Sequence, residues 1–268
     1  MNYPAPLIAT KILRPRRRDD LLHRRRLVDI IHNHIDRKLI ILSAPAGYGK
    51  TSLLIDYAHD TELPVCWYTL DERDSDPRVF LEYLVASVHR HYPDFGQRIS
   101  AILHGDESGL PNWETIAGAL VNDMVDRISE YFVIVLDDYH SLDDDADVHA
   151  LLDTLLQYLP EHCHILLASR TLPPLTLTRM AARQEVEGIG VDELRFTAHE
   201  IQQLMKQNYD LDLPDGQAEE LAQGLDGWIA GLLLTRHTLW KGLFAGMIRA
   251  HGESQVFEYL ATEVFGQQ

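Results

Sequence analysis

The sequence is poor in cysteine and lacks any long uninterrupted run of apolar residues. Its 268 residues include two cysteines, Cys66 and Cys163, each in a short apolar run that predicts a buried strand. Two such thiols exclude a disulfide framework and indicate a reducing compartment. The longest candidate membrane span, residues 228–234, is too short, and no basic region precedes the apolar patch at residues 6–9. We therefore expect a cytoplasmic protein that has no membrane partner.

Positive charge is scarce beyond the first fifty residues. The formal net charge is −17 at pH 7, of which residues 1–50 contribute +7 and the remainder −24. The strongly acidic remainder, residues 51–268, is not typical of a nucleic-acid-binding surface. We therefore expect no direct DNA contact from this chain. The arginines of the basic segment 1–26 are expected to be solvated or to pair with the acidic body.

What the sequence does contain is a phosphate-binding loop between a predicted strand and a predicted helix. An apolar run, residues 39–42, leads into Ala44-Pro45-Ala46-Gly47-Tyr48-Gly49-Lys50-Thr51. Small residues let backbone N–H groups approach a polyphosphate, and the start of a helix adds a field of the right sign. The strict pattern has glycine where Ala44 stands. The residues predicted to bind the phosphates of ATP or ADP are Ala46, Gly47, Tyr48, Gly49, Lys50, Thr51 and Ser52.

Two carboxylates end another buried run downstream. The apolar residues 131–136 stop at Asp137 and Asp138. Ligands of a parallel sheet gather at the carboxyl ends of its strands, so Asp137 is expected beside the phosphate loop. We predict that Lys50 contacts the terminal phosphates and that Thr51 and Asp137 hold Mg²⁺. Asp138 would orient or deprotonate the attacking water.

A further strand, residues 163–168, ends at Ser169-Arg170. By the same edge rule, Arg170 is predicted to lie near the γ-phosphate, where a cation could distinguish ATP from ADP. Three consecutive strand ends would then converge on one ligand.

The order of elements predicts an α/β fold followed by a small helical bundle. Thr197-Ala198-His199-Glu200 is a capping box and marks the start of the helical part. We assign residues 1–26 to a basic segment, 27–196 to a nucleotide-binding domain and 197–268 to a helical subdomain. The predicted strands span 39–42, 65–70, 131–136, 163–168 and 185–191. A predicted helix begins with residues 27–31, and further helices are predicted near 50–59, 77–92, 116–128, 148–156, 177–183, 198–209, 215–224, 228–249 and 253–265.

Five motifs together resemble one protein family. They are Ala44–Lys50, Leu70–Pro77 with Phe80 and Leu84, Leu136–His140, Ala168–Arg170, and Leu194–Thr197 before Glu200. The combination is similar to the ATP-binding part of the large ATP-dependent LuxR-type transcription activators, which are signal-transduction ATPases with numerous domains. The resemblance implies a P-loop NTPase sheet with strand order 5-1-4-3-2. It also implies a switch in which ADP holds a closed monomer, whereas ATP with an inducer permits self-association.

The resemblance gives roles to individual residues. It implies that Lys50 and Thr51 bind phosphate and Mg²⁺, that Asp137 and Asp138 form the acidic pair, and that Arg170 senses the γ-phosphate.

It further places Arg24 near the nucleotide base, ahead of the first strand. Residues 227–232 match a helical-domain motif that usually has proline where Ile229 stands. In that family a winged helix, a repeat sensor and a DNA-binding helix-turn-helix follow. We expect these sensor and DNA-binding domains to be missing here and interpret the chain as a truncated form.

Three functions fit the motifs. The first is a regulatory switch that binds ATP or ADP and uses slow Mg-dependent hydrolysis to control oligomerisation. The second is a stand-alone small-molecule kinase, which would need an acceptor pocket and a lid, yet no arginine-rich lid segment follows Asp138. The third is a ring-forming ATPase, in which Arg179 or Arg183 could reach into a neighbouring subunit.

Overall fold

The computed structural model describes residues 7–103, 112–142, 145–224 and 228. It divides into two compact units. The first runs up to Pro45 and continues from Lys50 to Gly190, and the second combines the loop Ala46–Gly49 with the residues from Val191 onward. Among the described residues, no helix has both the length and the apolarity to cross a membrane.

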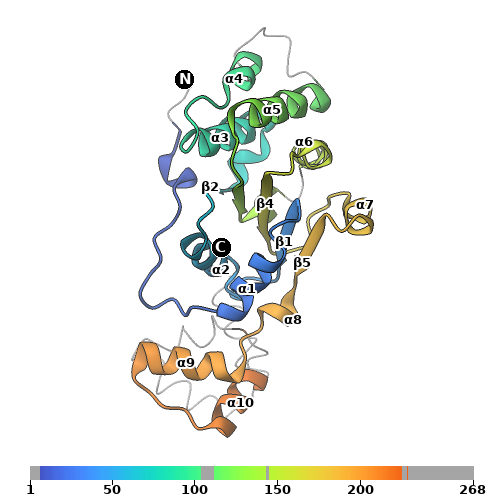
Figure 1. Ribbon diagram of the computed structural model, residues 1–268. Helices are drawn as coiled ribbons and strands as arrows, with labels where there is room; N and C mark the ends of the chain where they lie inside the picture. The colour runs from blue at the N-terminus through green and yellow to red at the C-terminus, as the bar shows by residue number, and fades with distance from the viewer. Residues whose placement is uncertain (1–6, 104–111, 143–144, 225–227, 229–268) are drawn as a thin grey trace. The chain divides into compact units, whose positions relative to one another are not determined.

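A five-stranded parallel sheet forms the centre of the first unit (Figure 1). Its strands lie in the order β2-β3-β4-β1-β5, which is the predicted order read from the opposite edge. The fold class is therefore confirmed. The pairing aligns Ser43 with Ser169 and Thr69 with Asp137, so the carboxyl ends of the strands share one edge. The strands are β1 (Leu39–Ser43), β2 (Val65–Thr69), β3 (Phe132–Asp137), β4 (Cys163–Ser169) and β5 (Val186–Ile189).

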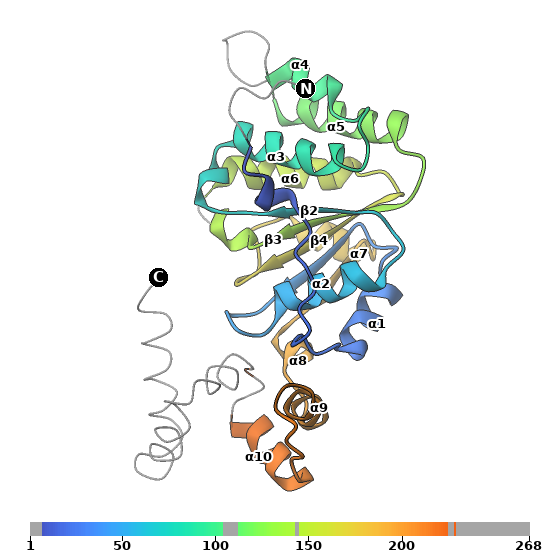
Figure 2. The same ribbon diagram turned by 90° about the vertical axis from the view of Figure 1, so that its left-hand side faces the viewer.

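Helices cover both faces of this sheet (Figure 2). Alternate strand residues, such as Leu39 and Ile41 of β1, join one core cluster with α3, α5 and α6, while α1 and α2 cover the opposite face. Strands β3 and β4 are buried on both faces, which explains their continuous apolar sequences. The helices of this unit are α1 (Arg25–Asn33), α2 (Lys50–Asp60), α3 (Pro77–His89), α4 (Gln97–Leu103), α5 (Trp113–Arg127), α6 (Ala146–Tyr158) and α7 (Leu177–Ala182).

The predictions missed the short elements. Helix α4 and three single-turn 3₁₀ helices, η1 (Ala9–Ile12), η2 (Glu72–Ser75) and η3 (Tyr139–Leu142), have too few residues to show a helical period. The predicted fifth strand was also too long. It ends at Ile189, and α8 (Val191–Leu194) begins two residues later, with Asp192 and Glu193 in its first turn, where acidic side chains favour a helix.

The basic N-terminal segment pairs with the acidic body, as expected. The Arg17 guanidinium lies 3.0 Å from a carboxylate oxygen of Asp56, and Arg25 lies 3.4 Å from Asp60. Arg14 donates a hydrogen bond of 2.7 Å to the Ala58 carbonyl oxygen. All three partners belong to α2, so the N-terminal segment is bound to that helix by ion pairs and a hydrogen bond.

In the described part of the second unit, α8 is followed by two helices that pack against each other, α9 (Ala198–Tyr209) and α10 (Asp215–Gly224). The predicted capping box opens α9: the Thr197 N–H donates to the Glu200 carboxylate at 2.9 Å, and the Glu200 N–H donates to the Thr197 hydroxyl at 3.2 Å. The helices predicted at 228–249 and 253–265 lie outside the described residues apart from Trp228.

Candidate functional site

Lys50 is the first residue of α2, and its side chain is buried. The ammonium donates hydrogen bonds to the carbonyl oxygens of Ala44 at 2.5 Å and of Pro45 at 3.0 Å. The N–H of Ala44 donates to the Ser169 carbonyl at 3.3 Å, so Ala44 prolongs the β1–β4 ladder. Ala44 has no positive φ angle, which explains why alanine serves where the strict pattern has glycine.

The loop Ala46–Gly49 has a backbone that requires its glycines. The φ angles of Gly47 and Gly49 are +88° and +80°, in the region that residues with a Cβ rarely adopt. Tyr48 lies between them and is 9% exposed. The carbonyl oxygen of Ala46 accepts a hydrogen bond of 2.9 Å from the indole Nε1–H of Trp228. Sequence reasoning missed this tryptophan, although it stands in the motif Gly227-Trp228.

The two predicted Mg²⁺ ligands meet in the first unit. The Thr51 hydroxyl donates to Oδ1 of Asp137 at 3.0 Å. Neighbouring ligand oxygens of an octahedral Mg²⁺, each about 2.1 Å from the metal, are about 3.0 Å apart. The spacing and the hard oxygen donors therefore fit one edge of such an octahedron.

Burial shifts the pKa values of Asp137 and Lys50. It raises the pKa of Asp137 to about 7, assisted by the negative charge of Asp138 and opposed by the Thr51 hydrogen bond and by Lys50. Burial also lowers the pKa of Lys50, and so does Arg170, while Asp138 and Asp137 act the other way. Asp137, Asp138 and Arg170 therefore all lie within electrostatic reach of Lys50.

Asp138 has an unusual backbone conformation. Its φ angle is +58°, which aspartate tolerates better than most residues but which still carries strain. Nδ1 of His140 lies 3.8 Å from Oδ1 of Asp138, an ion pair when the imidazole is protonated. Sequence reasoning gave His140 no role, although a titratable group two residues after a candidate catalytic aspartate was a signal that could have been used.

The remaining predicted residues occupy different environments. Arg170 follows β4 and is exposed, whereas Ser169 before it is fully buried. Ser52 is half-buried in the first turn of α2. Arg24 precedes α1 and is 5% exposed, and its backbone N–H donates to the Asp56 carboxylate at 3.2 Å. Its predicted place near the nucleotide base stays a prediction.

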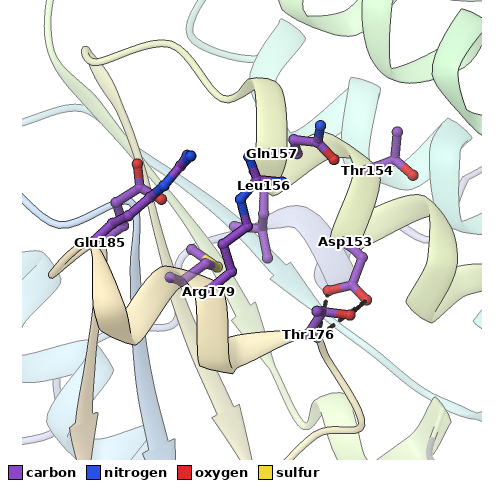
Figure 3. A pocket seen from close by; sticks show the side chains of 9 residues that line it. Asp153, Thr154, Leu156, Gln157, Thr176, Arg179 and Glu185 are labelled. Atoms are coloured by element: carbon purple, nitrogen blue, oxygen red, sulfur yellow. Dashed lines mark hydrogen bonds between the residues drawn. The ribbon is translucent and has the colours of Figure 1, made fainter.

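A separate small pocket lies where α6, α7 and the start of β5 meet (Figure 3). Its volume of about 170 Å³ is below the roughly 300 Å³ at which ligand pockets usually begin. Arg179 and Arg183 line it, and the N–H and hydroxyl of Thr176 donate to the Asp153 carboxylate. None of the predicted nucleotide-site residues lines this pocket.

Comparison with known proteins agrees with the motif resemblance. Residues 17–170 match the family described as Nephrocystin 3, N-terminal. The chain is 31% identical over 231 residues to the HTH-type transcriptional regulator MalT of Yersinia enterocolitica, and 29% identical over the same length to that of Yersinia pestis. Each alignment covers 85% of this chain but 25% of the relative, so the chain spans about a quarter of the length of these regulators. The resemblance to ATP-dependent LuxR-type activators is thereby confirmed.

Solved structures agree with the fold. A Signal Transduction ATPase with Numerous Domains that carries a tetratricopeptide repeat sensor, from Pyrococcus horikoshii, superposes with a TM-score of 0.57 at 16% identity, over 86% of this chain and 31% of that one. A Walker-type ATPase of Pyrococcus abyssi superposes with a TM-score of 0.55 at 15% identity, over 95% of this chain and 77% of that one.

Proposed function

This chain belongs to the Nephrocystin 3 N-terminal family, and on that premise we propose that it is the ATP/ADP-binding regulatory module of a signal-transduction ATPase of the MalT type. The observation that carries the proposal is the contact of 3.0 Å between Thr51 and Asp137, next to the buried Lys50. In this group the Lys50 cation suits a phosphate chain, and the Thr51 hydroxyl and the Asp137 carboxylate suit the metal ion that accompanies it.

Each residue has a separate task in this proposal. Backbone N–H groups of Ala46–Gly49 and the Lys50 ammonium bind the β- and γ-phosphates. Thr51 and Asp137 hold Mg²⁺, which when bound neutralises charge on the phosphate oxygens. Asp138 orients the attacking water and accepts its proton.

Arg170 senses whether the γ-phosphate is present. The charge of Arg170 already lowers the pKa of Lys50, so the two cations are close enough for one phosphate group to interact with both. Loss of the γ-phosphate would therefore affect Arg170 as well as Lys50. Slow hydrolysis would then limit the lifetime of the ATP-bound state. We extend the proposal to the division into residues 1–26, 27–196 and 197–268, to self-association of the ATP-bound form, and to sensor and DNA-binding domains in the full-length protein.

The test of nucleotide binding compares three proteins by titration calorimetry with MgATP. Lys50→Met is expected to weaken binding by at least about a hundredfold, because it removes the cation that binds the terminal phosphates. Lys38→Met is the matched control, since Lys38 precedes the opposite end of β1 and pairs with Glu185 at 3.4 Å. Equal affinity of wild type and Lys50→Met would contradict the proposal.

The test of turnover uses Asp138→Asn. The variant is expected to keep the affinity for MgATP and to lose hydrolysis by about a hundredfold, because the amide cannot accept a proton from water. Fast turnover by wild type in nucleotide-dependent rings, with loss of activity in Arg179→Ala, would favour the ring-forming ATPase instead. Phosphate transfer to an added acceptor would favour a kinase.

A further inference from the structure

One hydrogen bond among the described residues of the second unit joins residues that are 182 positions apart in the sequence. The indole Nε1–H of Trp228 donates to the carbonyl oxygen of Ala46, at the start of the loop Ala46–Gly49, over 2.9 Å. Trp228 is 8% exposed. A buried indole N–H requires a hydrogen-bond acceptor. This bond therefore orients the Trp228 indole and the Ala46 carbonyl toward each other.

The bond fixes the direction of one peptide group. The Ala46–Gly47 peptide is trans, and in a trans peptide the carbonyl and the N–H point in opposite directions. Because the Ala46 carbonyl points to Trp228, the N–H of Gly47 points away from it. Donation to the carbonyl also polarises the peptide and makes that N–H a better donor.

The loop needs such an external support. Gly47 and Gly49 both have positive φ angles, and glycine can leave this conformation for others at little steric cost. A flip of the Ala46–Gly47 peptide would turn the Gly47 N–H around and leave the buried indole N–H without its acceptor. Trp228 therefore opposes a motion that the sequence of the loop itself permits.

We propose that Trp228 is a positioning residue for phosphate binding, which holds the Ala46–Gly47 peptide so that the Gly47 N–H is directed at the phosphate chain. This inference rests on the proposed nucleotide-binding function. It also has a reciprocal consequence: phosphates held by the loop stabilise the Trp228 contact by the same factor as Trp228 strengthens their binding.

The experiment measures binding of MgATP and of inorganic tripolyphosphate to wild type, Trp228→Phe and the control Trp113→Phe by calorimetry. Phenylalanine keeps an aromatic ring but removes the N–H donor. Trp228→Phe is expected to bind both ligands about three- to tenfold more weakly, by the same factor, because each ligand depends on the oriented Gly47 N–H. Trp113→Phe, at the start of α5, is expected to match wild type.

Three results would overturn the inference. Trp228→Phe could bind both ligands as tightly as wild type, or it could lose affinity for MgATP alone, in which case the tryptophan acts on the base side of the nucleotide. If the wild-type chain binds neither ligand, both the inference and the proposed function are wrong. Binding of tripolyphosphate without binding of MgATP would contradict the proposed function alone and would leave the effect of Trp228 measurable.

A second measurement uses the native side chain and is independent of how well the variant folds. Acrylamide quenching of tryptophan emission is recorded for wild type and for Trp113→Phe with and without tripolyphosphate. If the loop and the indole stabilise each other, the accessible fraction of the emission falls in both proteins when the phosphate is added. An unchanged fraction would contradict the inference.

Discussion

The first unit contains two buried lysines, and their surroundings differ in kind. Lys11 and Lys50 are each 8% exposed. The ammonium of Lys11 contacts both carboxylate oxygens of the fully buried Asp74, at 2.6 and 2.5 Å, and lies 4.5 Å from the ring centre of Tyr83. Among the described residues, Lys50 forms no ion pair within 4.0 Å, and its ammonium is bonded to two neutral carbonyl groups.

The difference separates a structural cation from one that is available to a ligand. The charge of Lys11 is neutralised at contact distance, so nothing further is needed to stabilise it. The charge of Lys50 is balanced only at longer range by Asp137 and Asp138, and burial lowers its pKa. A polyphosphate would supply the contact that Lys50 lacks, and four predictions test this comparison.

The largest effect on stability is expected at Lys11. Lys11→Met leaves the buried Asp74 carboxylate without its cation, which costs about 3–5 kcal/mol in the free energy of unfolding. Urea denaturation followed by circular dichroism measures the loss. The double variant Lys11→Met/Asp74→Asn should recover most of it, because the buried charge is removed. A single variant as stable as wild type would show that this pair is dispensable.

Asp137→Asn tests the carboxylate near Lys50, and its effect depends on pH. The folded state raises the pKa of Asp137 from 3.8 to about 7, so the folded protein binds the extra proton between these values. The unfolding free energy of wild type therefore falls as pH rises through this window. In Mg-free buffer at pH 8 the variant should be more stable by on the order of 4 kcal/mol, and near pH 4 the two should be equal.

Thermal unfolding of both proteins from pH 4 to pH 8 measures this difference. A stability difference that does not change with pH would contradict a buried, uncompensated carboxylate at position 137. Asp76→Asn serves as a control, because that carboxylate caps α3 through the Arg78 N–H at the surface and its amide keeps the same bond.

The comparison also shows what the sequence could predict. Lys50, Thr51 and the pair Asp137-Asp138 follow continuous apolar strands, and this local order along the chain is what allowed them to be predicted as site residues. Lys11 lies in a basic segment that looks solvated in the sequence, and its partner Asp74 is 63 residues away in a single helical turn. No periodicity connects such residues, and only the packing of η1 against β2 and α3 brings them together.

Trp228 was missed for the same reason. The motif around it was recognised, but a resemblance directs attention to the position that usually carries proline, here Ile229, rather than to its neighbour. The bond to the Ala46 carbonyl depends on a backbone atom, which has no sequence signal at all. Long-range contacts to main-chain groups are thus the part of a site that a single sequence does not reveal.

A smaller effect on stability is expected when the Lys50 cation at the start of α2 is removed. Lys50→Met is predicted to change the free energy of unfolding by less than about 1 kcal/mol without nucleotide. The loss of two hydrogen bonds to carbonyl groups is offset by the removal of a desolvated charge. The same urea experiment as for Lys11→Met measures it. A loss as large as that of Lys11→Met would remove the distinction between the two lysines.

The smallest effect is expected at Asp71, the half-exposed acidic neighbour of Lys11. Its carboxylate lies 3.2 Å from the ammonium but is 49% exposed, so solvent screens the pair. Asparagine keeps the side-chain oxygen that accepts the Arg73 N–H at 2.9 Å and removes only the charge. Asp71→Asn should therefore cost no more than about 0.5 kcal/mol in urea denaturation. A cost comparable to that of Lys11→Met would mean that Asp74 alone does not neutralise Lys11, and that the two lysines differ less than their contacts indicate.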